Sequence, residues 1–546
     1  MHALKSKLLQ NWKSGITVSI VSIPLALALA ITSGATPTQG IITAFWAGLL
    51  GAIFGGSNFN IIGPTGALAG ILITYALAHG SEVLPAVAVL SGLLILIAYI
   101  FNLDKYIVFI PRSVVHGFTL GVAFNIALGQ LDNIFGITGL QKTDSLVKNI
   151  LITLQHISQT DWLIVGIFLI STLFILFWNK KFPKIPGAAI VAFLSISAMM
   201  VLPALGYTPS ILTIGDKYPS LHATLFENPL LQLQWNIFLV KDIWVLAIAV
   251  AVISILETLL SGQIADTMTG TKFNRKKEVL GLSIANLGSG LMGGIPATAA
   301  LARTALNIKS GANHKASGAI NAIFVGAIAL FLVSFFKLLP MVIVASILVV
   351  VAIGMVERKH FIHLVENERI AFVLSLIVAF VVVVEDPMMG ILAGTVIALL
   401  IFVNKLSYGQ TEVLIWKNGK MTEALLKNDF LKKAVIDSDI IVYKITGALT
   451  YINMPAHLEA AQKIKNNNYI ILSLRHSFYA DIDGIDYLGE IIEVLKKKNN
   501  KKILIAGINK EIEKLIHKEA FYKKKLVEGK IYKRTSEAIK EIIPKY

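Results

Sequence analysis

Long apolar stretches separated by short polar segments run from the start of the chain to about residue 404. A helix needs about 17–25 apolar residues to cross the hydrocarbon core of a bilayer, and fewer where the helix is broken. On this basis the pattern predicts fourteen transmembrane spans. Their approximate bounds are 15–34, 40–55, 64–79, 83–101, 113–130, 162–178, 187–204, 242–262, 279–293, 297–309, 317–335, 340–356, 370–384 and 387–404.

Two of these spans, the third and the tenth, are short and interrupted by glycine and proline. The third begins in GPTGALAG, residues 63–70, and the tenth lies in GGIPATAALAR, residues 293–303. A backbone break within lipid leaves N–H and C=O groups unpaired unless they line a cavity or bind a ligand. Breaks at corresponding places in two halves of seven spans predict an inverted repeat, with a binding site between the halves near mid-membrane. The alternative is that both breaks only kink buried helices.

Basic residues predict the orientation of the spans. The loops after even-numbered spans are the basic ones, which places them and both termini in the cytoplasm of a multi-pass protein of the cell membrane. These loops contain Lys105, Arg112, Lys180, Lys181, Lys184, Lys272, Arg275, Lys276, Lys277, Lys309, Lys315, Arg358, Lys359 and Arg369. The opposite loops contain only Lys142, Lys148, Lys217, Lys241 and Lys337.

The pattern changes after the last span. Apolar runs at 439–447, 469–476 and 501–508 predict strands, and they alternate with predicted helices at 455–467, 485–500 and 509–518. We therefore expect a transport domain at 1–404, a linker at 405–436 and a small cytosolic α/β domain at 437–546. This domain shows no Gly-rich phosphate loop and no nucleophile motif, so we expect a binding or regulatory module, and the chain is not expected to be an enzyme.

Composition agrees with this division. Charged residues make up 15% of the chain, against about 25% in soluble proteins. Both parts share the net charge of +16, which fits cytoplasmic loops and a domain near an anionic leaflet better than nucleic-acid binding. The absence of cysteine excludes disulfides and thiolate chemistry.

Glu257 is the principal candidate for ion coupling. It lies inside the apolar run of the eighth span, where an ionisable residue is costly and indicates a functional site. Burial would favour the protonated carboxyl and make Glu257 a proton carrier, whereas a nearby sodium ion would favour the charged form. Ser261 lies four residues later on the same helical face. The alternative is that Glu257 only hydrogen-bonds a neighbouring helix.

The two breaks are candidates for anion binding. A helix that starts within the membrane points free N–H groups and a positive dipole end at the break. Thr65 adds a hydroxyl at the first break, and Arg303 can add a full positive charge at the second. Alternatively, Arg303 extends to the cytoplasmic interface.

Other polar residues have simpler interpretations. Asn125 and Gln130 are expected to bridge helices, and Asp266 is expected to be solvated or to cap a loop. We predict that His116, beside Arg112, lies at the cytoplasmic membrane interface and does not act as a proton relay. His360 and His363 lie in a charged loop, and no metal site is expected.

Taken together, these segments resemble the SulP anion transporter family (solute carrier family 26). The matching stretches are SIPLALALAITSGATP, GPTGALAGI, HGFTLGVAFNIALGQL, SILETLLSGQIADTMTG and GGIPATAALARTALNIKSGA, and the end of the chain resembles a STAS domain. The resemblance implies a polytopic α-helical fold with fourteen spans as a seven-plus-seven inverted repeat, core and gate domains, elevator-type alternating access and a homodimer.

The resemblance also implies roles for individual residues. Thr65, Gly66, Ala299, Ala300 and Leu301 would line the anion site with backbone or hydroxyl groups, and Arg303 would support the anion. Glu257 and Ser261 would serve a coupling proton or sodium ion, and no other cofactor is implied. Asp483 occupies the STAS position that often carries a phosphorylatable Ser or Thr.

These observations predict a secondary active transporter of a small anion. Bicarbonate and sulfate are favoured and a dicarboxylate is possible. The resemblance also implies two differences from the bicarbonate-transporting branch of the family. That branch usually lacks Arg at the position of Arg303 and favours Asp at the position of Glu257. Both differences argue against bicarbonate as the substrate and against sodium as the coupling ion. The alternatives are an anion channel or exchanger on the same scaffold, or a nucleobase permease of similar repeat architecture.

Overall fold

The structure of the chain is a computed structural model that separates into two units, Met1–Ile397 and Ala398–Tyr546. It describes residues 2–103, 105, 110–141, 143, 145–182, 185–207, 210–219, 221–227, 240–385, 387–407, 412–417, 420–425, 440–462, 464, 469–499, 502–518 and 531–542. Of the loop residues used above for the topology, Lys142 and Lys184 lie outside these ranges. Each unit is described by itself.

The first unit is helical, and each of the fourteen predicted spans coincides with a helix. In chain order these helices are α1 (His2–Thr32), α2 (Pro37–Phe54), α3 (Gly66–His79), α4 (Leu84–Ile100), α5 (Arg112–Leu128), α8 (Trp162–Lys181), α9 (Gly187–Ala204), α11 (Lys241–Thr269), α12 (Arg275–Leu291), α13 (Leu301–Lys309), α14 (Ala316–Lys337), α15 (Met341–Met355), α17 (Arg369–Val384) and α18 (Pro387–Ser407). Shorter helices are η1 (Ser81–Val83), α6 (Leu131–Phe135), α7 (Leu146–Gln155), η3 (Ile157–Gln159), α10 (Ile214–Lys217) and α16 (Arg358–Asn367).

The helices that follow the two breaks are the shortest of the fourteen. Within the described residues, nine helical segments are long and apolar enough to cross a membrane alone. The helices α3 and α13 have 14 and 9 residues, which is too short for a complete crossing. The interruptions predicted from glycine and proline are therefore present in both halves.

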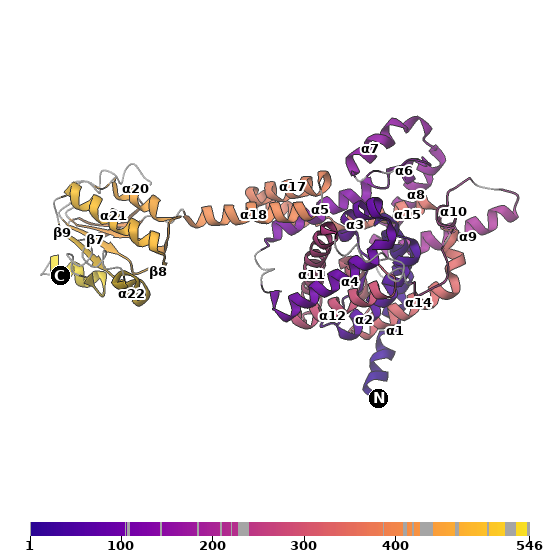
Figure 1. Cartoon of the computed structure of the whole chain (residues 1–546), viewed down its shortest axis with the longest axis horizontal. Helices are drawn as coiled ribbons and strands as arrows, with labels where there is room; N and C mark the ends of the chain where they lie inside the picture. The colour runs from indigo at the N-terminus through magenta and orange to yellow at the C-terminus, as the bar shows by residue number, and fades with distance from the viewer. Residues whose placement is uncertain are drawn as a thin grey trace. The chain divides into compact units, whose positions relative to one another are not determined.

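Each of the main helix contacts between the two halves has a counterpart in which the roles of the halves are reversed. Helices α1 and α2 of the first half both pack on α14 of the second half. Correspondingly, α11 and α12 of the second half both pack on α4 of the first half. Likewise, α5 packs on α17 and α15 packs on α8. Figure 1 shows α2, α4, α12 and α14 close together in this unit. This exchange of partners is what an inverted repeat of seven spans requires.

A pair of two-residue strands joins the two breaks. Strand β1 (Ile62–Gly63) runs antiparallel to β2 (Thr298–Ala299), with Ile62 opposite Ala299 and Gly63 opposite Thr298. The chain continues from β1 into α3 and from β2 into α13. Backbone groups that lipid would leave unpaired are thus satisfied between the halves, and the two half-helices begin beside each other.

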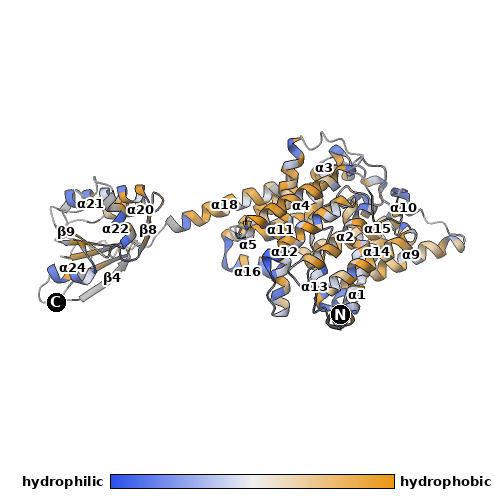
Figure 2. Ribbon diagram, turned by 60° about the horizontal axis from the view of Figure 1, so that its bottom comes forward, coloured by the Kyte–Doolittle hydropathy of each residue, from blue (hydrophilic) through white to orange (hydrophobic). Residues whose placement is uncertain are grey.

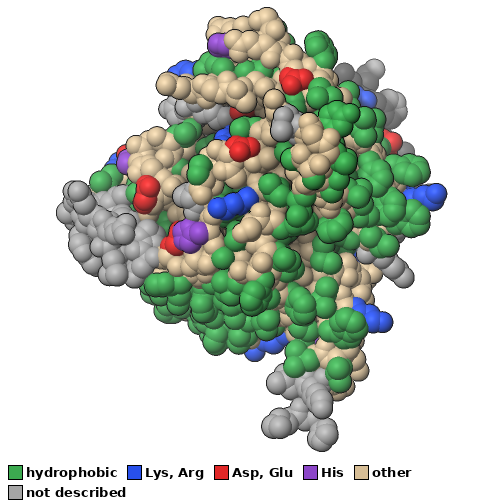
Figure 3. All heavy atoms as spheres, turned by 90° about the vertical axis from the view of Figure 1, so that its right-hand side faces the viewer, with side chains coloured by type: hydrophobic (Ala, Val, Ile, Leu, Met, Phe, Trp, Pro, Cys, Tyr) green, Lys and Arg blue, Asp and Glu red, His purple; other side chains and the backbone are tan. Residues whose placement is uncertain are grey.

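The surface of the first unit is apolar where it can face lipid. Figure 2 shows hydrophobic residues along most of the helices of this unit. Figure 3 shows one face on which hydrophobic side chains are abundant and charged ones few. Large side chains such as Phe193 and Phe331 are 61% and 83% exposed. Such exposure is expected where the surrounding solvent is hydrocarbon.

The second unit is an α/β domain. Its main sheet has the strand order β10-β9-β7-β5-β3-β4. The strands are β3 (Glu412–Lys417), β4 (Lys420–Leu425), β5 (Ile440–Lys444), β7 (Tyr469–Ser473), β9 (Lys502–Ala506) and β10 (Ile531–Tyr532). The pairs β5–β7, β7–β9 and β9–β10 are parallel, whereas β3 is antiparallel to β4 and β5. The three predicted strands are confirmed, and β3 and β4 extend the sheet into the range that we assigned to the linker.

Helices cover both faces of this sheet. The helices are α20 (Met454–Gln462), α21 (Ile482–Asn499), α22 (Lys510–Lys518) and α24 (Thr535–Ile542), and strands β6 (Gly447–Leu449) and β8 (Ser477–Ala480) pair separately. Alternate strand residues point to opposite faces, so Ile441 and Tyr443 pack with α20, α21 and α22, while Ile440 and Val442 pack with α24. Asp481 caps α21 through the N–H of Gly484, and Asp483 is exposed in its first turn.

Candidate functional site

A cavity of about 70 Å³ lies beside the paired breaks. By this measure one water molecule needs roughly 10–15 Å³, so the cavity has room for several waters or one small oxyanion. It lies between α1, α3, α11 and α13 on one side and α5, α15 and α18 on the other. Its walls are mainly apolar and come from Leu25, Leu29, Ile110, Val114, Val115, Phe118, Ile253, Leu256, Leu260, Val351, Met355 and Ile391.

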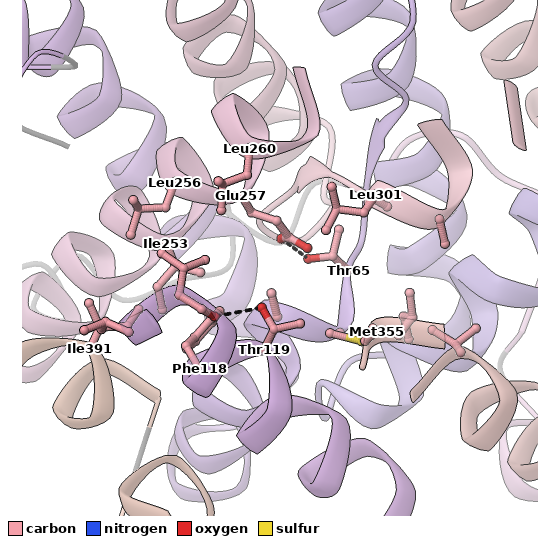
Figure 4. Close-up of a pocket in the computed structure, with 18 of the residues that line it drawn as sticks. Thr65, Phe118, Thr119, Ile253, Leu256, Glu257, Leu260, Leu301, Met355 and Ile391 are labelled. Carbon is pink, nitrogen blue, oxygen red and sulfur yellow. Dashed lines mark hydrogen bonds between the residues drawn. The ribbon is translucent and has the colours of Figure 1, made fainter. Parts of the chain in front are cut away.

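Glu257 brings a carboxyl to this apolar cavity. It extends from α11, and Thr65, the residue before α3, donates its hydroxyl hydrogen to Glu257 Oε2 over 3.1 Å. Figure 4 shows Glu257 and Thr65 pointing toward one another, with Leu301 beside them. A side chain from the second half is therefore bonded to the break of the first half, close to where an anion could enter.

Two further hydroxyls lie near Glu257 on the side of β2. Thr298 lies within hydrogen-bonding reach of the Glu257 carboxyl. Thr298 Oγ1 is also 2.9 Å from Thr258 Oγ1 and donates to the carbonyl of Ser254 over 3.2 Å. Carboxylate, hydroxyl and carbonyl oxygens are ligands suited to a hard cation. Thr258 and Thr298 were not among the predicted site residues, although both lie within the motifs that define the site.

The half-helices direct N–H groups toward the cavity. The first N–H groups of a helix have no acceptor within that helix, and neither Thr65 nor Ala300 caps its helix with a side chain. Thr65, Gly66, Ala300 and Leu301 all line the cavity, as does Ala302. The positive ends of two helix dipoles thus meet at an apolar pocket, which favours a bound anion.

Ala299 does not line this cavity. It is completely buried in β2, and its N–H donates to Thr258 Oγ1 over 3.1 Å. The N–H of Ala300 is likewise used, because it donates to the carbonyl of Ile61 over 3.2 Å. In this structure the free donors are therefore expected in the first turns of α3 and α13 rather than in the strand pair.

Arg303 lies behind the strand pair and not in the cavity wall. Its side chain is only 1% exposed, and Nη2 donates to the carbonyl of Pro64 over 2.8 Å. A Cβ atom at Gly63 would lie 2.7 Å from Nη1, so glycine is needed there for the guanidinium to approach the backbone. Arg303 and Glu257 attract each other electrostatically across this region. Arg303 can therefore support an anion through its field and by fixing the first break.

Ser261 lies one turn beyond Glu257 on α11, but it is not in the cavity. Its hydroxyl is completely buried and lies 3.0 Å from both Asn60 Oδ1 and Thr304 Oγ1. Thr304 Oγ1 in turn accepts the N–H of Ile61 over 3.3 Å. Ser261 thus links α11 to α13 and to the chain that leads into β1.

Asn125 and Asp266 make the contacts that we predicted for them. Asn125 bridges α5 and α17 by donating to the carbonyl of Val382 over 3.2 Å. Asp266 caps the loop after α11 by accepting from Thr271 and from the N–H of Phe273. His116 is 3.7 Å from Glu357 and its ring lies against His360, at the end of α5 that we predict to be cytoplasmic. No cluster of potential metal ligands occurs among the described residues.

A second cavity of about 700 Å³ borders the later turns of α3. It is lined by Gly70, Thr74 and Asn125, by the segment around α6 and α7, and by residues at the junction of α17 and α18. The first turn of α3 therefore faces the small cavity, and its later turns face the large one. The two cavities are separated where Gly66 packs closely against Ile126 of α5. The packing is so close that a Cβ atom at residue 66 would lie 2.2 Å from Cδ1 of Ile126.

Comparison with known proteins decides the family. The model of the sulfate permease family matches residues 8–378, and that of the STAS domain matches residues 432–538. The chain belongs to the sulfate permease family. Among its relatives is a putative sulfate transporter, YvdB of Bacillus subtilis, which is 30% identical over 518 residues, covering 94% of this chain and 93% of the relative. The bicarbonate transporter BicA of a Picosynechococcus species is 25% identical over 421 residues, covering 73% of this chain and 70% of the relative.

Solved structures show the same fold. The overall structure of SLC26A9 aligns with a TM-score of 0.80 at 15% identity, covering 98% of this chain and 90% of that one. The transmembrane domain of a cyanobacterial BicA aligns with a TM-score of 0.57 at 22% identity, covering 72% of this chain and 97% of that one. The sulfate permease chain described here is therefore a helical membrane protein with the fold of these transporters and a C-terminal STAS domain.

Proposed function

We propose that this protein is a secondary active transporter of a small inorganic anion, coupled to the movement of a proton or a sodium ion. Sulfate and bicarbonate are the favoured substrates, and a dicarboxylate is a further candidate. The protein acts as a homodimer in the cell membrane with both termini in the cytoplasm. The relatives named as sulfate and bicarbonate transporters support the class of substrate.

The observation that carries the proposal is the position of Glu257. Its carboxyl lies in an apolar cavity beside the starts of α3 and α13, where an anion would bind. An unneutralised carboxylate would repel that anion, because charges interact strongly in a medium of low dielectric constant. A proton on Glu257, or a sodium ion beside it, removes this repulsion. Binding of the anion and the cation is then mutually favourable, which is the basis of coupled transport.

The arrangement of the cavities supports alternating access by an elevator movement. The helices α1, α3, α11 and α13 carry the site, while α5, α15 and α18 form the opposite wall. Sliding of the first group past the second would carry the site from one side of the membrane to the other. The large cavity along α3 and α5 would then be the outer entrance, closed in this structure where Gly66 packs on Ile126.

An anion channel or a passive exchanger on the same scaffold is the competing function. Neither needs a carboxyl at the anion site, because a passive path gains nothing from a group that repels its substrate. Coupled transport predicts net accumulation of the anion driven by the gradient of the coupling cation, whereas a channel or exchanger does not use that gradient. The two functions therefore differ in a measurable property of the purified protein.

The test is uptake of labelled sulfate, bicarbonate and fumarate into proteoliposomes under separate proton and sodium gradients. We expect accumulation of one inorganic anion above its equilibrium level, driven by only one of the two cation gradients. Protein-free liposomes and gradients collapsed with ionophores are the controls. Equilibration without accumulation under every gradient would contradict coupled transport.

A further inference from the structure

We propose that Glu278 and Asn60 are positioning residues that hold strand β1 against α11 and thereby set the distance between Thr65 and Glu257. The inference rests on the proposed coupling through Glu257 for its functional readout. Glu278 lies in the first turns of α12, outside the cavity, and takes no part in the site as described so far.

Glu278 is a buried carboxylate with three hydrogen-bond donors. It is 1% exposed. Its Oε2 accepts the backbone N–H groups of Gly56 and Ser57, each over 2.7 Å, and its Oε1 accepts from Asn60 Nδ2 over 2.7 Å. Burial opposes the negative charge of Glu278, whereas these three hydrogen bonds, the ammonium group of Lys315 and the start of α12 favour it. Glu278 therefore replaces the backbone partners that the segment between α2 and β1 lacks.

Asn60 links the segment that Glu278 binds to helix α11. Its Nδ2 also donates to the carbonyl of Thr258 over 3.2 Å, while its Oδ1 accepts from Ser261 Oγ over 3.0 Å. The amide group is thus fully engaged, with its orientation fixed by the carboxylate of Glu278. Rotation of the amide would place its Oδ1 against the carboxylate of Glu278 and the carbonyl of Thr258, which are both acceptors.

The stretch that contains β1 is consequently attached to α11 at two points. Asn60 contacts Thr258 and Ser261 before the strand, and Thr65 contacts Glu257 after it. The two attachments are five residues apart in the strand segment and within about one turn of each other on the helix. A change at the first point will therefore shift the second, where the coupling ion is proposed to bind.

The corresponding segment in the other half is held without charge. The stretch that leads into β2 is bonded by Thr43 Oγ1 to the N–H of Ile295, by Asn286 to both backbone groups of Ala297, and by Ser289 to the carbonyl of Ile295. All three side chains are neutral. Among the described residues, an acidic side chain holds the segment only at the first break, where Thr65 contacts Glu257. This asymmetry places Glu278 in the coupling function rather than in general support of the repeat.

The test exchanges the donor and the acceptor. In Glu278→Gln, an NH2 group would face Asn60 Nδ2, and in Asn60→Asp, two carboxylates would face each other. The double variant restores one donor and one acceptor between positions 278 and 60 with their direction reversed, while the carbonyl of Thr258 loses its donor. Ser283→Ala is the matched control, because Ser283 is a buried residue of α12 whose hydroxyl bonds Gly92 on α4 and not this segment.

Two properties are measured in the full-length protein. The first is the proton or sodium concentration that gives half-maximal uptake of labelled sulfate or bicarbonate. The second is hydrogen exchange of the backbone amides in residues 58–66, followed in detergent. We expect each single variant to raise the half-activating concentration about tenfold or more and to speed exchange. The double variant should recover part of each loss, because the carbonyl of Thr258 still lacks its donor, and Ser283→Ala should change only the unfolding temperature.

The outcomes separate this inference from the proposed function. Single variants that keep wild-type half-activation and exchange would overturn the positioning role, as would a double variant no better than either single one. A wild-type protein without any cation dependence would contradict the coupling instead. In that case the hydrogen-exchange rates of residues 58–66 alone decide whether Glu278 and Asn60 position the strand.

Discussion

Glu257 and Arg303 both lie beside the strand pair, and of the two only Glu257 lines the cavity. The guanidinium is held by the carbonyl of Pro64, and no hydrogen-bond partner of its Nε occurs among the described residues. A cation behind the backbone can attract an anion without contacting it, since little solvent lies between them to screen the field. The site therefore combines the positive ends of two helix dipoles, a positive charge outside the cavity and a carboxyl that a cation can neutralise.

The charge of Arg303 should determine part of the anion affinity. Arg303→Lys keeps the charge, whereas Arg303→Met keeps much of the apolar volume without it. We expect the Met variant to bind the substrate roughly tenfold more weakly, as is typical for loss of an interaction with a charged group. The Lys variant should lose much less. Isothermal titration in detergent measures both, and equal losses would mean that the bond to Pro64 matters rather than the charge.

At the residue scale, the sequence indicated candidate positions for the site but did not indicate most of their contacts. Glu257 and Thr65 are apparent because polar groups are costly in an apolar run, and the structure brings them together. The contacts of Ser261 were not predictable, because its partners Asn60 and Thr304 come from segments about 200 and 43 residues away. Helical spacing places Ser261 on the face of Glu257 but cannot identify what that face contacts.

His457 should make the STAS domain sensitive to acid. It is buried, and Tyr443 Oη lies 3.0 Å from its Nδ1. Burial lowers the pKa of His457 to about 4, whereas the unfolded chain has a pKa of about 6.5. The unfolded state therefore binds more protons below pH 6.5, and stability falls as the pH drops from there toward 4.

The expected loss between pH 7 and pH 5 is about 2 kcal/mol in the free energy of unfolding. Urea unfolding of the fragment 410–546, followed by circular dichroism, measures it. His457→Gln should be less stable at pH 7 and should show a smaller decrease toward pH 5. An unchanged pH profile in that variant would exclude His457 as the cause.

At the scale of elements, the two half-helices explain why a short broken span can exist in a membrane. Each is too short to cross alone, and each is completed by a strand that pairs with the other half. The existence of both breaks follows from glycine and proline in the sequence. Their pairing as Ile62 opposite Ala299 does not, because two-residue strands have no period and their partners are over 230 residues apart.

Close packing of α5 on α17 should depend on Gly117. A Cβ atom there would lie 2.4 Å from the carbonyl oxygen of Ser375 and 2.9 Å from its Cα, so the helices must separate. We expect Gly117→Ala to destabilise the protein by about 1–3 kcal/mol, seen as a lower unfolding temperature in detergent. Gly166→Ala on α8 is the control, because nothing lies within 4 Å of its added Cβ. Equal stability of the two variants would contradict this account of the α5–α17 contact.

At the scale of the whole molecule, transport and regulation are expected to reside in different units. Every residue of the site lies in the first unit, Met1–Ile397. The hydrophobic pattern predicted this unit well, since each expected span coincides with a helix. It did not predict strands β3 and β4, which pair with each other and join the sheet through the pairing of β3 with β5.

Deletion of residues 437–546 should therefore leave anion affinity unchanged. The truncated protein should insert and remain monodisperse, while its transport rate or yield falls because the STAS domain can bias the moving helices or assist assembly. Titration of the identified anion into the truncated and full-length proteins compares them directly. A monodisperse truncated protein that no longer binds the anion would show that the domain shapes the site.

Net accumulation by Glu257→Gln is the most direct test of coupled transport. The amide keeps the size of the carboxyl and its contact with Thr65, but it can neither carry a proton nor neutralise a sodium ion. Proteoliposomes with the variant should exchange labelled anion for unlabelled anion at a measurable rate and should not concentrate it under the cation gradient that drives the wild type. A variant that accumulates the anion as well as the wild type would contradict the role of Glu257 as the coupling residue.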